Sequence, residues 1–161
     1  TKVNLQRSAQ LLNKTNQMNL STRRMSEEEV WAWAANPVRR FWTFSVADKF
    51  GDSGLTGLAS VEEYEGALRL VDFVLSCRVM GRHIEEAILS VAADYARGRG
   101  LNAVQAQFVP TSKNKPCLDF FRGTGFVEES PNNFTWKVAS AFATPDSVRM
   151  ERRDMLLKDG R

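Results

Sequence analysis

Residues 75–89, LSCRVMGRHIEEAIL, join an apolar strand to an amphipathic helix through a short basic turn, and the architecture follows from this junction. The first backbone N–H groups of a helix have no partner within it and lie at the positive end of the helix dipole. With Arg78 and Arg82 beside Gly81, the turn is expected to seat a phosphate. The alternative is that Gly81 only turns the chain and that both arginines are solvated.

Three antiparallel strands are expected before the junction. Residues 40–48 carry large apolar side chains at every second position, which is the period of a strand with one buried face, and residues 55–64 are predicted to be the hairpin partner. Residues 67–77 are apolar on both sides of the pleat, a pattern typical of a strand that is covered on both faces. This third strand, with Cys77 inside it, is therefore predicted to be central.

The elements after the junction alternate between helix and strand. A helix is predicted over residues 81–98 and a strand over 103–109, which a helical crossover would make a parallel neighbour of the central strand. A second helix over 112–122 and a hairpin of 126–129 with 134–138 complete the pattern. The sequence thus predicts an α+β fold in which helices flank a mixed central sheet.

Both ends of the chain differ from this pattern. Ser26 and Glu29 form a capping box that begins a short helix before the strands, and residues 1–25 form an amide-rich, weakly amphipathic lead-in. We expect three parts: the lead-in, which would be a linker from a missing N-terminal domain, a domain over 26–140, and a charged tail over 141–161. The tail's predicted docking face consists of Met150, Met155, Leu156 and Leu157.

Composition limits the classes of protein to which the chain can belong. Its 161 residues, of which 43% are hydrophobic, suffice for one core, and a net charge of +3 without a basic stripe argues against nucleic acid as a partner. Cys77 and Cys117 form neither a disulfide framework nor a metal-ligand cluster, so no metal is expected and reduced thiols in the cytoplasm are the simplest interpretation. No apolar run is long enough for a membrane helix, and no signal peptide is evident.

The order of elements and the segment 114–126, which ends in Gly125-Phe126, resemble the GCN5-related N-acetyltransferase (GNAT) fold over residues 26–140. Segments 14–24, 76–82 and 110–114 together resemble the C-terminal GNAT-like domain of FkbH-like proteins. That resemblance implies an upstream phosphatase-type domain of the haloacid dehalogenase superfamily. It also implies transfer of a glyceryl unit to an acyl carrier protein, for polyketide extender units of the methoxymalonyl type.

The chain departs from the pattern of the resembled superfamily at two places. In the pyrophosphate loop, Gln/Arg-x-x-Gly-x-Gly/Ala, His83 stands where glycine would let the backbone approach phosphate, and Glu85 replaces a small residue and would repel a pyrophosphate. Phe120-Phe121 stands where these acetyltransferases often carry a tyrosine that protonates the leaving thiolate, so Cys117 or a water would have to serve as the acid.

The resemblance implies a set of site residues. Cofactor binding is expected from Leu75, Cys77, Arg78, Gly81, Arg82, His83 and Asn114, which would contact acyl-coenzyme A or a carrier-bound phosphopantetheine arm. Catalysis is expected from Cys77 as acyl acceptor, since Arg78 and the helix start favour its thiolate, with Glu62 or Glu63 as base and His83 in phosphate contact or proton transfer.

Alternatives remain at each of these positions. Cys77 could be a small core residue, Glu62 and Glu63 solvated charges, and His83 a capping or surface residue. The amide-rich segment 14–19 could bind pantetheine, although a tether of the lead-in to the sheet is the preferred interpretation. The leading functional prediction is a GNAT-like acyltransferase domain. Its rivals are a non-catalytic module that docks a carrier protein and a small-molecule N-acetyltransferase that uses acetyl-coenzyme A.

Overall fold

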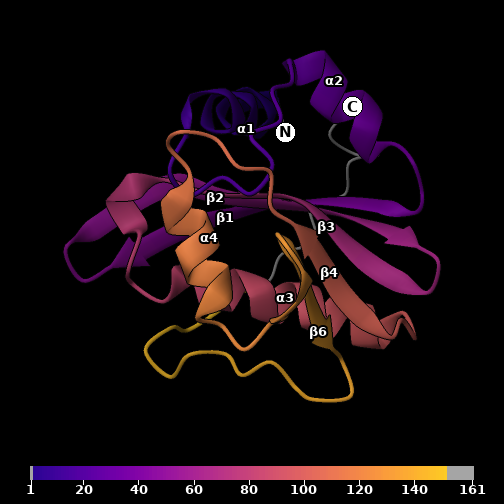
Figure 1. Ribbon diagram of the computed structural model, residues 1–161. Coiled ribbons are helices and arrows are strands. Elements are labelled where there is room, and N and C mark those ends of the chain that lie inside the picture. Colours follow the sequence, from indigo (N-terminus) through magenta and orange to yellow (C-terminus); the bar gives the residue numbers. More distant parts are fainter. Residues whose placement is uncertain (1, 152–161) are drawn as a thin grey trace.

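A computed structural model describes residues 2–151 and has one mixed sheet of six strands (Figure 1). The strand order is β1-β2-β3-β4-β6-β5, in which only β3 and β4 pair in parallel. The predicted central strand and its parallel neighbour are thereby confirmed. The strands are β1 (Arg39–Asp48), β2 (Gly51–Tyr64), β3 (Ala67–Leu75), β4 (Ala103–Gln107), β5 (Val127–Ser130) and β6 (Asn133–Lys137).

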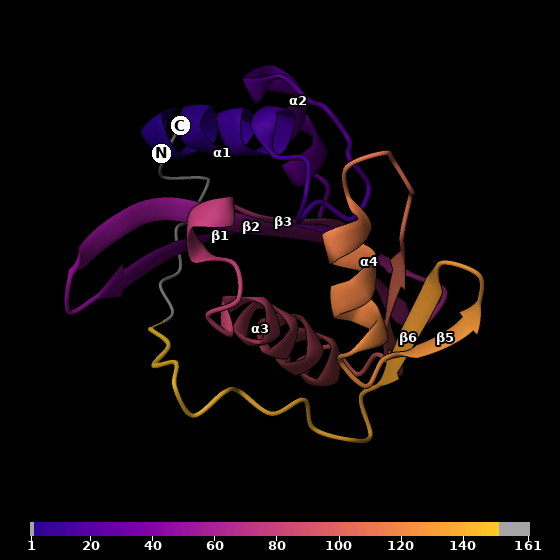
Figure 2. The same cartoon turned by 60° about the vertical axis from the view of Figure 1, so that its left-hand side comes forward.

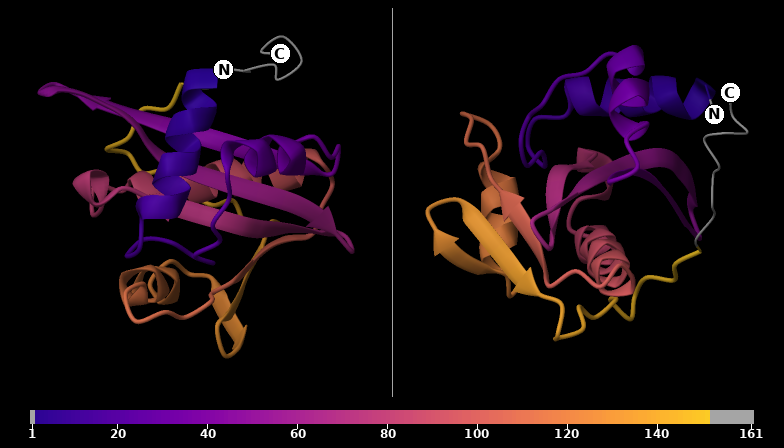
Figure 3. Two further views of the ribbon diagram at one scale, coloured as in Figure 1. Left: turned by 90° about the horizontal axis from the view of Figure 1, so that it is seen from above. Right: turned by 90° about the vertical axis from the view of Figure 1, so that its right-hand side faces the viewer.

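Helices cover both faces of the sheet. α1 (Lys2–Lys14) and α2 (Glu27–Ala34) lie on one face, and α3 (Ile84–Gly98) lies on the other (Figures 2 and 3). α4 (Lys115–Arg122) follows β4 and packs Phe120 and Phe121 against Phe73 of β3. The capping box at the start of α2 is confirmed, because Ser26 accepts from the Glu29 backbone and the Glu29 carboxylate accepts from the Ser26 backbone.

Two hydrophobic clusters follow from these layers. The larger lies between the sheet, α3 and α4 and includes Phe73, Ile88 and Phe121, while the smaller lies beneath α1 and α2. The smaller cluster joins Leu12 of α1 to Val74 of β3. Residues of the lead-in therefore supply part of the core. Because burial of apolar surface is the main favourable term in folding, these residues contribute to the stability of the domain.

Three local predictions were wrong. β3 ends at Leu75, and Cys77 lies outside it in a 3-10 turn, η1 (Cys77–Val79), because the Ser76 side chain accepts from the Arg78 backbone and turns the chain. α3 begins at Ile84, three residues later than expected. α4 likewise begins at Lys115, three residues after the predicted start at residue 112. Of the tail's predicted docking face, Met155, Leu156 and Leu157 lie outside the described residues.

The gap between β3 and β4 is closed by a segment from the lead-in. The two strands pair over only three positions, from Leu68 with Val104 to Leu70 with Ala106, and β3 then continues to Leu75 paired with β2 but no longer with β4. Beyond that point Leu20 donates its backbone N–H to Phe73 and accepts from Val109, both at 3.0 Å. Met18 accepts from the Leu75 backbone at 3.0 Å. The chain between α1 and α2 thus takes the place of a strand.

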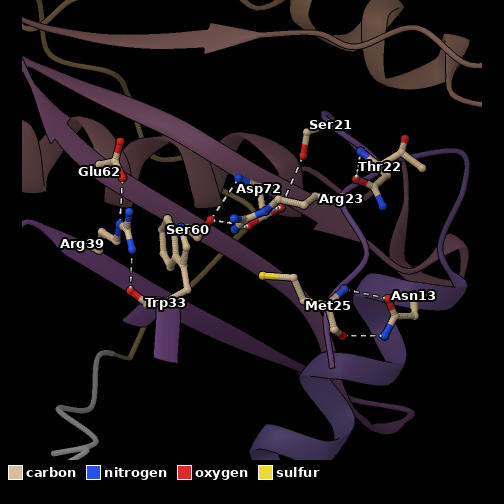
Figure 4. A network of polar contacts seen from close by, with 11 residues as sticks. Asn13, Ser21, Thr22, Arg23, Met25, Trp33, Arg39, Ser60, Glu62 and Asp72 are labelled. Carbon is tan, nitrogen blue, oxygen red and sulfur yellow. Dashed lines mark hydrogen bonds and ion pairs between the residues drawn. The ribbon is translucent and has the colours of Figure 1, made fainter. Parts of the chain in front are cut away.

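A buried ion pair fixes the same segment to the middle of β3 (Figure 4). Asp72 is fully buried and accepts from two nitrogens of Arg23, Nε and Nη2, from the Ser60 hydroxyl at 2.6 Å and from the Ser21 hydroxyl at 3.3 Å. The Arg23 guanidinium lies 4.8 Å above the ring of Trp33. Because a buried carboxylate is costly unless it is paired, Arg23 and Asp72 stabilise this arrangement only together.

We expect Arg23→Ala to lower the free energy of unfolding by about 3 kcal/mol, because the Asp72 carboxylate would stay buried without its cation. Urea denaturation followed by tryptophan fluorescence measures the change. Arg122→Ala is the matched control, since it removes an arginine from an exposed pair with Glu128. Equal stability of Arg23→Ala and wild type would contradict this account of the ion pair.

Candidate functional site

The predicted phosphate seat at the start of α3 holds a side chain of the protein itself. Glu85, only 5% exposed, accepts the backbone N–H of Gly81 at 2.8 Å with Oε2. Arg78 donates to the Ser53 carbonyl at 3.4 Å, and Arg82 pairs with Asp48 at 2.5 Å. Both arginines thus contact the β1–β2 hairpin. A carboxylate already satisfies one amide that a phosphate would use.

His83 precedes α3 with a φ of +63° and makes no capping hydrogen bond with its side chain. Its ring Nδ1 lies 2.9 Å from Glu86, and the side chain is 63% exposed. The left-handed backbone takes the conformation that glycine would supply, which is uncommon for a residue with a β-carbon. His83 therefore lies beside the α3 start, as expected, and faces solvent there.

An open groove of about 760 Å³ lies between α1, Cys77 of η1 and the start of α4. Its lining includes four basic side chains, one thiol and residues 15–17 of the turn after α1. Among residues 2–151, neither Lys14 nor Lys113 has an acidic partner, so their charges are available. The lining residues are Arg7, Gln10, Leu11, Lys14, Thr15, Asn16, Gln17, Ser76, Cys77, Ser112, Lys113, Lys115 and Pro116.

The two cysteines have opposite environments. Cys77 is exposed in the groove, with its sulfur 3.5 Å from the Gln17 amide oxygen, so it is not the small core residue of the alternative interpretation. Cys117 is fully buried in α4, and burial raises the pKa of its thiol to about 12. Cys117 is therefore a poor proton donor to a substrate bound at the surface. Of the two cysteines, only Cys77 is accessible to a thioester.

Asn114 is fully buried and ties three segments together. Its amide nitrogen donates to the carbonyls of Val109 at 2.8 Å and Asn19 at 3.1 Å, and its amide oxygen accepts from the Thr111 backbone at 2.7 Å. These bonds hold the segment that closes the gap between β3 and β4. The preferred interpretation of residues 14–19, a tether to the sheet, agrees with this arrangement.

The expected site residues do not all meet. Leu75, Cys77 and Asn114 lie around residues 17–20, and Arg78, Gly81, Arg82 and His83 follow at the α3 start. Glu62 pairs with Arg69 across the sheet, whereas the end of β3 near Cys77 pairs with Gly57. The Glu62 carboxylate lies 2.8 Å from the Arg39 guanidinium and 3.4 Å from that of Arg69. The structure therefore does not bring Glu62 to Cys77.

Sequence reasoning missed the basic residues of the groove. Lys113 and Lys115 precede and begin α4, while Arg7 and Lys14 belong to α1, and only the tertiary fold makes them neighbours. The signal that could have indicated them was the pair of lysines, Lys113 and Lys115, at the start of the helix predicted over 112–122. Within residues 2–151, no group of three His, Cys, Asp or Glu side chains could hold a metal ion, and no helix there is long and apolar enough to span a membrane.

Comparison with known proteins identifies the fold. No protein-family model and no curated protein matches the sequence. Among solved structures, the ribosomal-protein-S18-alanine N-acetyltransferase of Escherichia coli matches with a TM-score of 0.59 at 10% identity, over 93% of this chain and 96% of that one. Rv2747 of Mycobacterium tuberculosis, solved with CoA and NLQ, matches with a TM-score of 0.60 at 16% identity, over 81% and 70% of the two chains.

A GNAT-family acetyltransferase of Staphylococcus aureus matches with a TM-score of 0.54 at 10% identity, over 70% of this chain and 75% of that one. The mixed sheet with helices on both faces is therefore the GNAT acetyltransferase fold, as the resemblance implied. At these identities the similarity establishes architecture, and chemistry has to be argued from the residues themselves.

We expect Asn114→Ala to lower the free energy of unfolding by about 2 kcal/mol, because it leaves the buried Asn19 carbonyl and the partly buried Val109 carbonyl without the donor that they have in the wild type. Hydrogen exchange of residues 18–22 should accelerate more than that of α3. If Asn114 served only a bound pantetheine, the variant would unfold like wild type.

We expect the thiol reagent DTNB to modify Cys77 within minutes at pH 8 and to spare Cys117 until the protein unfolds. The raised pKa of Cys117 means that burial of its neutral thiol stabilises the fold below about pH 9 and that this contribution is lost as the pH rises toward 12. Cys77→Ser should abolish the fast reaction. Two fast-reacting thiols in the native protein would contradict the assignment.

Proposed function

We propose that this GNAT-fold domain is of the acyltransferase type and receives the phosphopantetheine arm of an acyl carrier protein in the groove beside Cys77. The observation that carries the proposal is the conjunction of Cys77 with Arg7, Lys14, Lys113 and Lys115 along one groove. Lysine side chains suit a phosphodiester, and a cluster of them attracts an acidic protein surface.

The carrier-bound arm suits this site better than coenzyme A. Coenzyme A carries a diphosphate, for which the fold's expected seat is the α3 start, and there Glu85 already accepts the Gly81 amide. The carrier-bound arm carries a single phosphodiester, which the lysines at the start of α4 can meet. The arm would then lie over residues 15–17, whose backbone and amide side chains can bond to its two amide groups.

The proposed chemistry is transfer of an acyl group between thiols. The Cys77 thiolate would attack the thioester carbonyl, a new carbon–sulfur bond would form to Cys77, and the pantetheine sulfur would leave as a thiolate and take up a proton. The Gln17 amide, 3.5 Å from the sulfur, would orient it. The roles of Glu62 and His83 in proton transfer stay predictions, and the proposed transfer does not depend on them.

The resemblance to FkbH-like proteins supports a more specific role. In that role an upstream phosphatase-type domain would prepare a glyceryl unit. This domain would assist its transfer to the carrier by the reverse of the same thioester exchange, from Cys77 to the pantetheine sulfur, in polyketide extender-unit synthesis of the methoxymalonyl type, in the cytoplasm. The position of α1 is consistent with such a role, because its C-terminal half forms one wall of the groove.

A second candidate, a module that docks the carrier without catalysis, has an observation in its favour. Leu20 and Met18 close the gap between β3 and β4, so a thioester could not lie between those strands with the segment in place. The basic groove would serve docking equally well. The third possibility, a small-molecule N-acetyltransferase, requires acetyl-coenzyme A binding.

Calorimetric titration with holo carrier protein, apo carrier protein, coenzyme A and acetyl-coenzyme A tests the proposal. We expect binding of the holo carrier, and Lys113→Glu with Lys115→Glu should weaken it by at least about tenfold, since like charges then face the acidic partner. Lys49→Glu with Lys137→Glu makes the same charge change away from the groove and should leave binding unchanged. Equal loss in both double variants would contradict a binding site in the groove.

Intact mass after incubation with glyceryl- or acetyl-loaded carrier separates transfer from docking. A single adduct that Cys77→Ser abolishes is the result expected for the acyltransferase. Binding of the holo carrier without any adduct would overturn transfer and favour the docking module.

A further inference from the structure

We infer that Glu85 is a specificity-determining residue that excludes diphosphate ligands, coenzyme A among them, by filling the anion seat at the start of α3 with the protein's own carboxylate. The inference rests on the proposed function, because it specifies which pantetheine compounds the domain as a whole accepts. It concerns a different part of the domain from the groove beside Cys77.

Two observations describe the Glu85 carboxylate at this position. α3 is a 15-residue helix that follows Gly81, whose backbone N–H points to the Glu85 carboxylate at 2.8 Å. The second is the other carboxylate oxygen, Glu85 Oε1, which is buried and has no hydrogen-bond partner within the described part of the chain. A buried carboxylate oxygen without a partner is uncommon, since most buried polar atoms are bonded.

Glu85 lies where a phosphate would gain most from the helix. As the second residue of α3, it lies near the positive end of the helix dipole. A diphosphate at the same amide would be repelled by the Glu85 carboxylate. Because Glu85 is only 5% exposed, water screens this repulsion poorly. Binding there would require Glu85 to leave its buried position or to gain a proton.

The cations near the seat do not cancel this repulsion. Arg82 is engaged by Asp48, and Arg78 reaches Ser53 on the other side of the turn. The backbone itself is accessible, because a β-carbon added at Gly81 would meet no atom within 4 Å. At Gly81 itself, the obstacle to a diphosphate is therefore the Glu85 carboxylate rather than steric closure of the turn.

Removal of Glu85 should create the missing affinity. We expect Glu85→Ala to bind coenzyme A and inorganic pyrophosphate at least tenfold more tightly than wild type, with Glu85→Gln between the two, because glutamine loses the charge but can still accept from Gly81. Glu86→Ala is the matched control. It removes one negative charge from the same helical turn but not from the Gly81 amide.

Each outcome of this titration is decisive. An equal gain in Glu85→Ala and Glu86→Ala would overturn the inference, because a general change in charge would explain it. No gain in either Glu85 variant, with melting temperatures showing that at least one remains folded, would overturn it as well. Failure of the holo carrier to bind any variant would overturn the proposed function and leave the inference about Glu85 standing.

Discussion

The closure of the gap between β3 and β4 by the backbone of Leu20 is the constraint on which the rest of the structure depends. Two parallel strands that diverge leave N–H and C=O groups without partners, and buried groups of this kind are costly. The Leu20 backbone N–H donates to the carbonyl of Phe73 in β3, and the Leu20 carbonyl accepts from the backbone N–H of Val109, just after β4. Asp72 with Arg23 and Asn114 with Asn19 then hold the segment in place from its two sides.

This closure limits where the domain can hold a ligand. The gap between the strands is filled by the lead-in, and the start of α3 is filled by Glu85. Four basic side chains, those of Arg7, Lys14, Lys113 and Lys115, line the outer groove between α1, η1 and α4, where Cys77 is exposed. We therefore expect a ligand to bind in this outer groove. A partner protein can reach the groove more readily than a cleft between the strands.

The order and type of the central elements could be predicted because their signals are local. The capping box at Ser26, the two-residue period of β1 and the apolar run of β3 are each visible within about ten residues. The GNAT fold followed from their order. The exit of Cys77 from β3 could not be predicted, because an apolar run does not show where a serine side chain will turn the chain.

The candidate site was predictable only in part, since it depends on contacts between distant residues. The sequence marked Glu85 as unfavourable for a pyrophosphate, yet its bond to Gly81 depends on the backbone geometry of the turn. The groove joins α1 to α4, about 100 residues apart, and no periodicity in either helix indicates that neighbourhood. The bond of Asn114 to Asn19, which are 95 residues apart in the chain, could not be predicted for the same reason.

A crystal structure of the domain with a phosphopantetheine-bearing carrier protein would test the central claim most directly. The account predicts that the arm lies between Cys77 and Lys115, with Leu20 still bonded to Phe73 and Val109. An arm inserted between β3 and β4, with residues 18–20 displaced from the sheet, would contradict it.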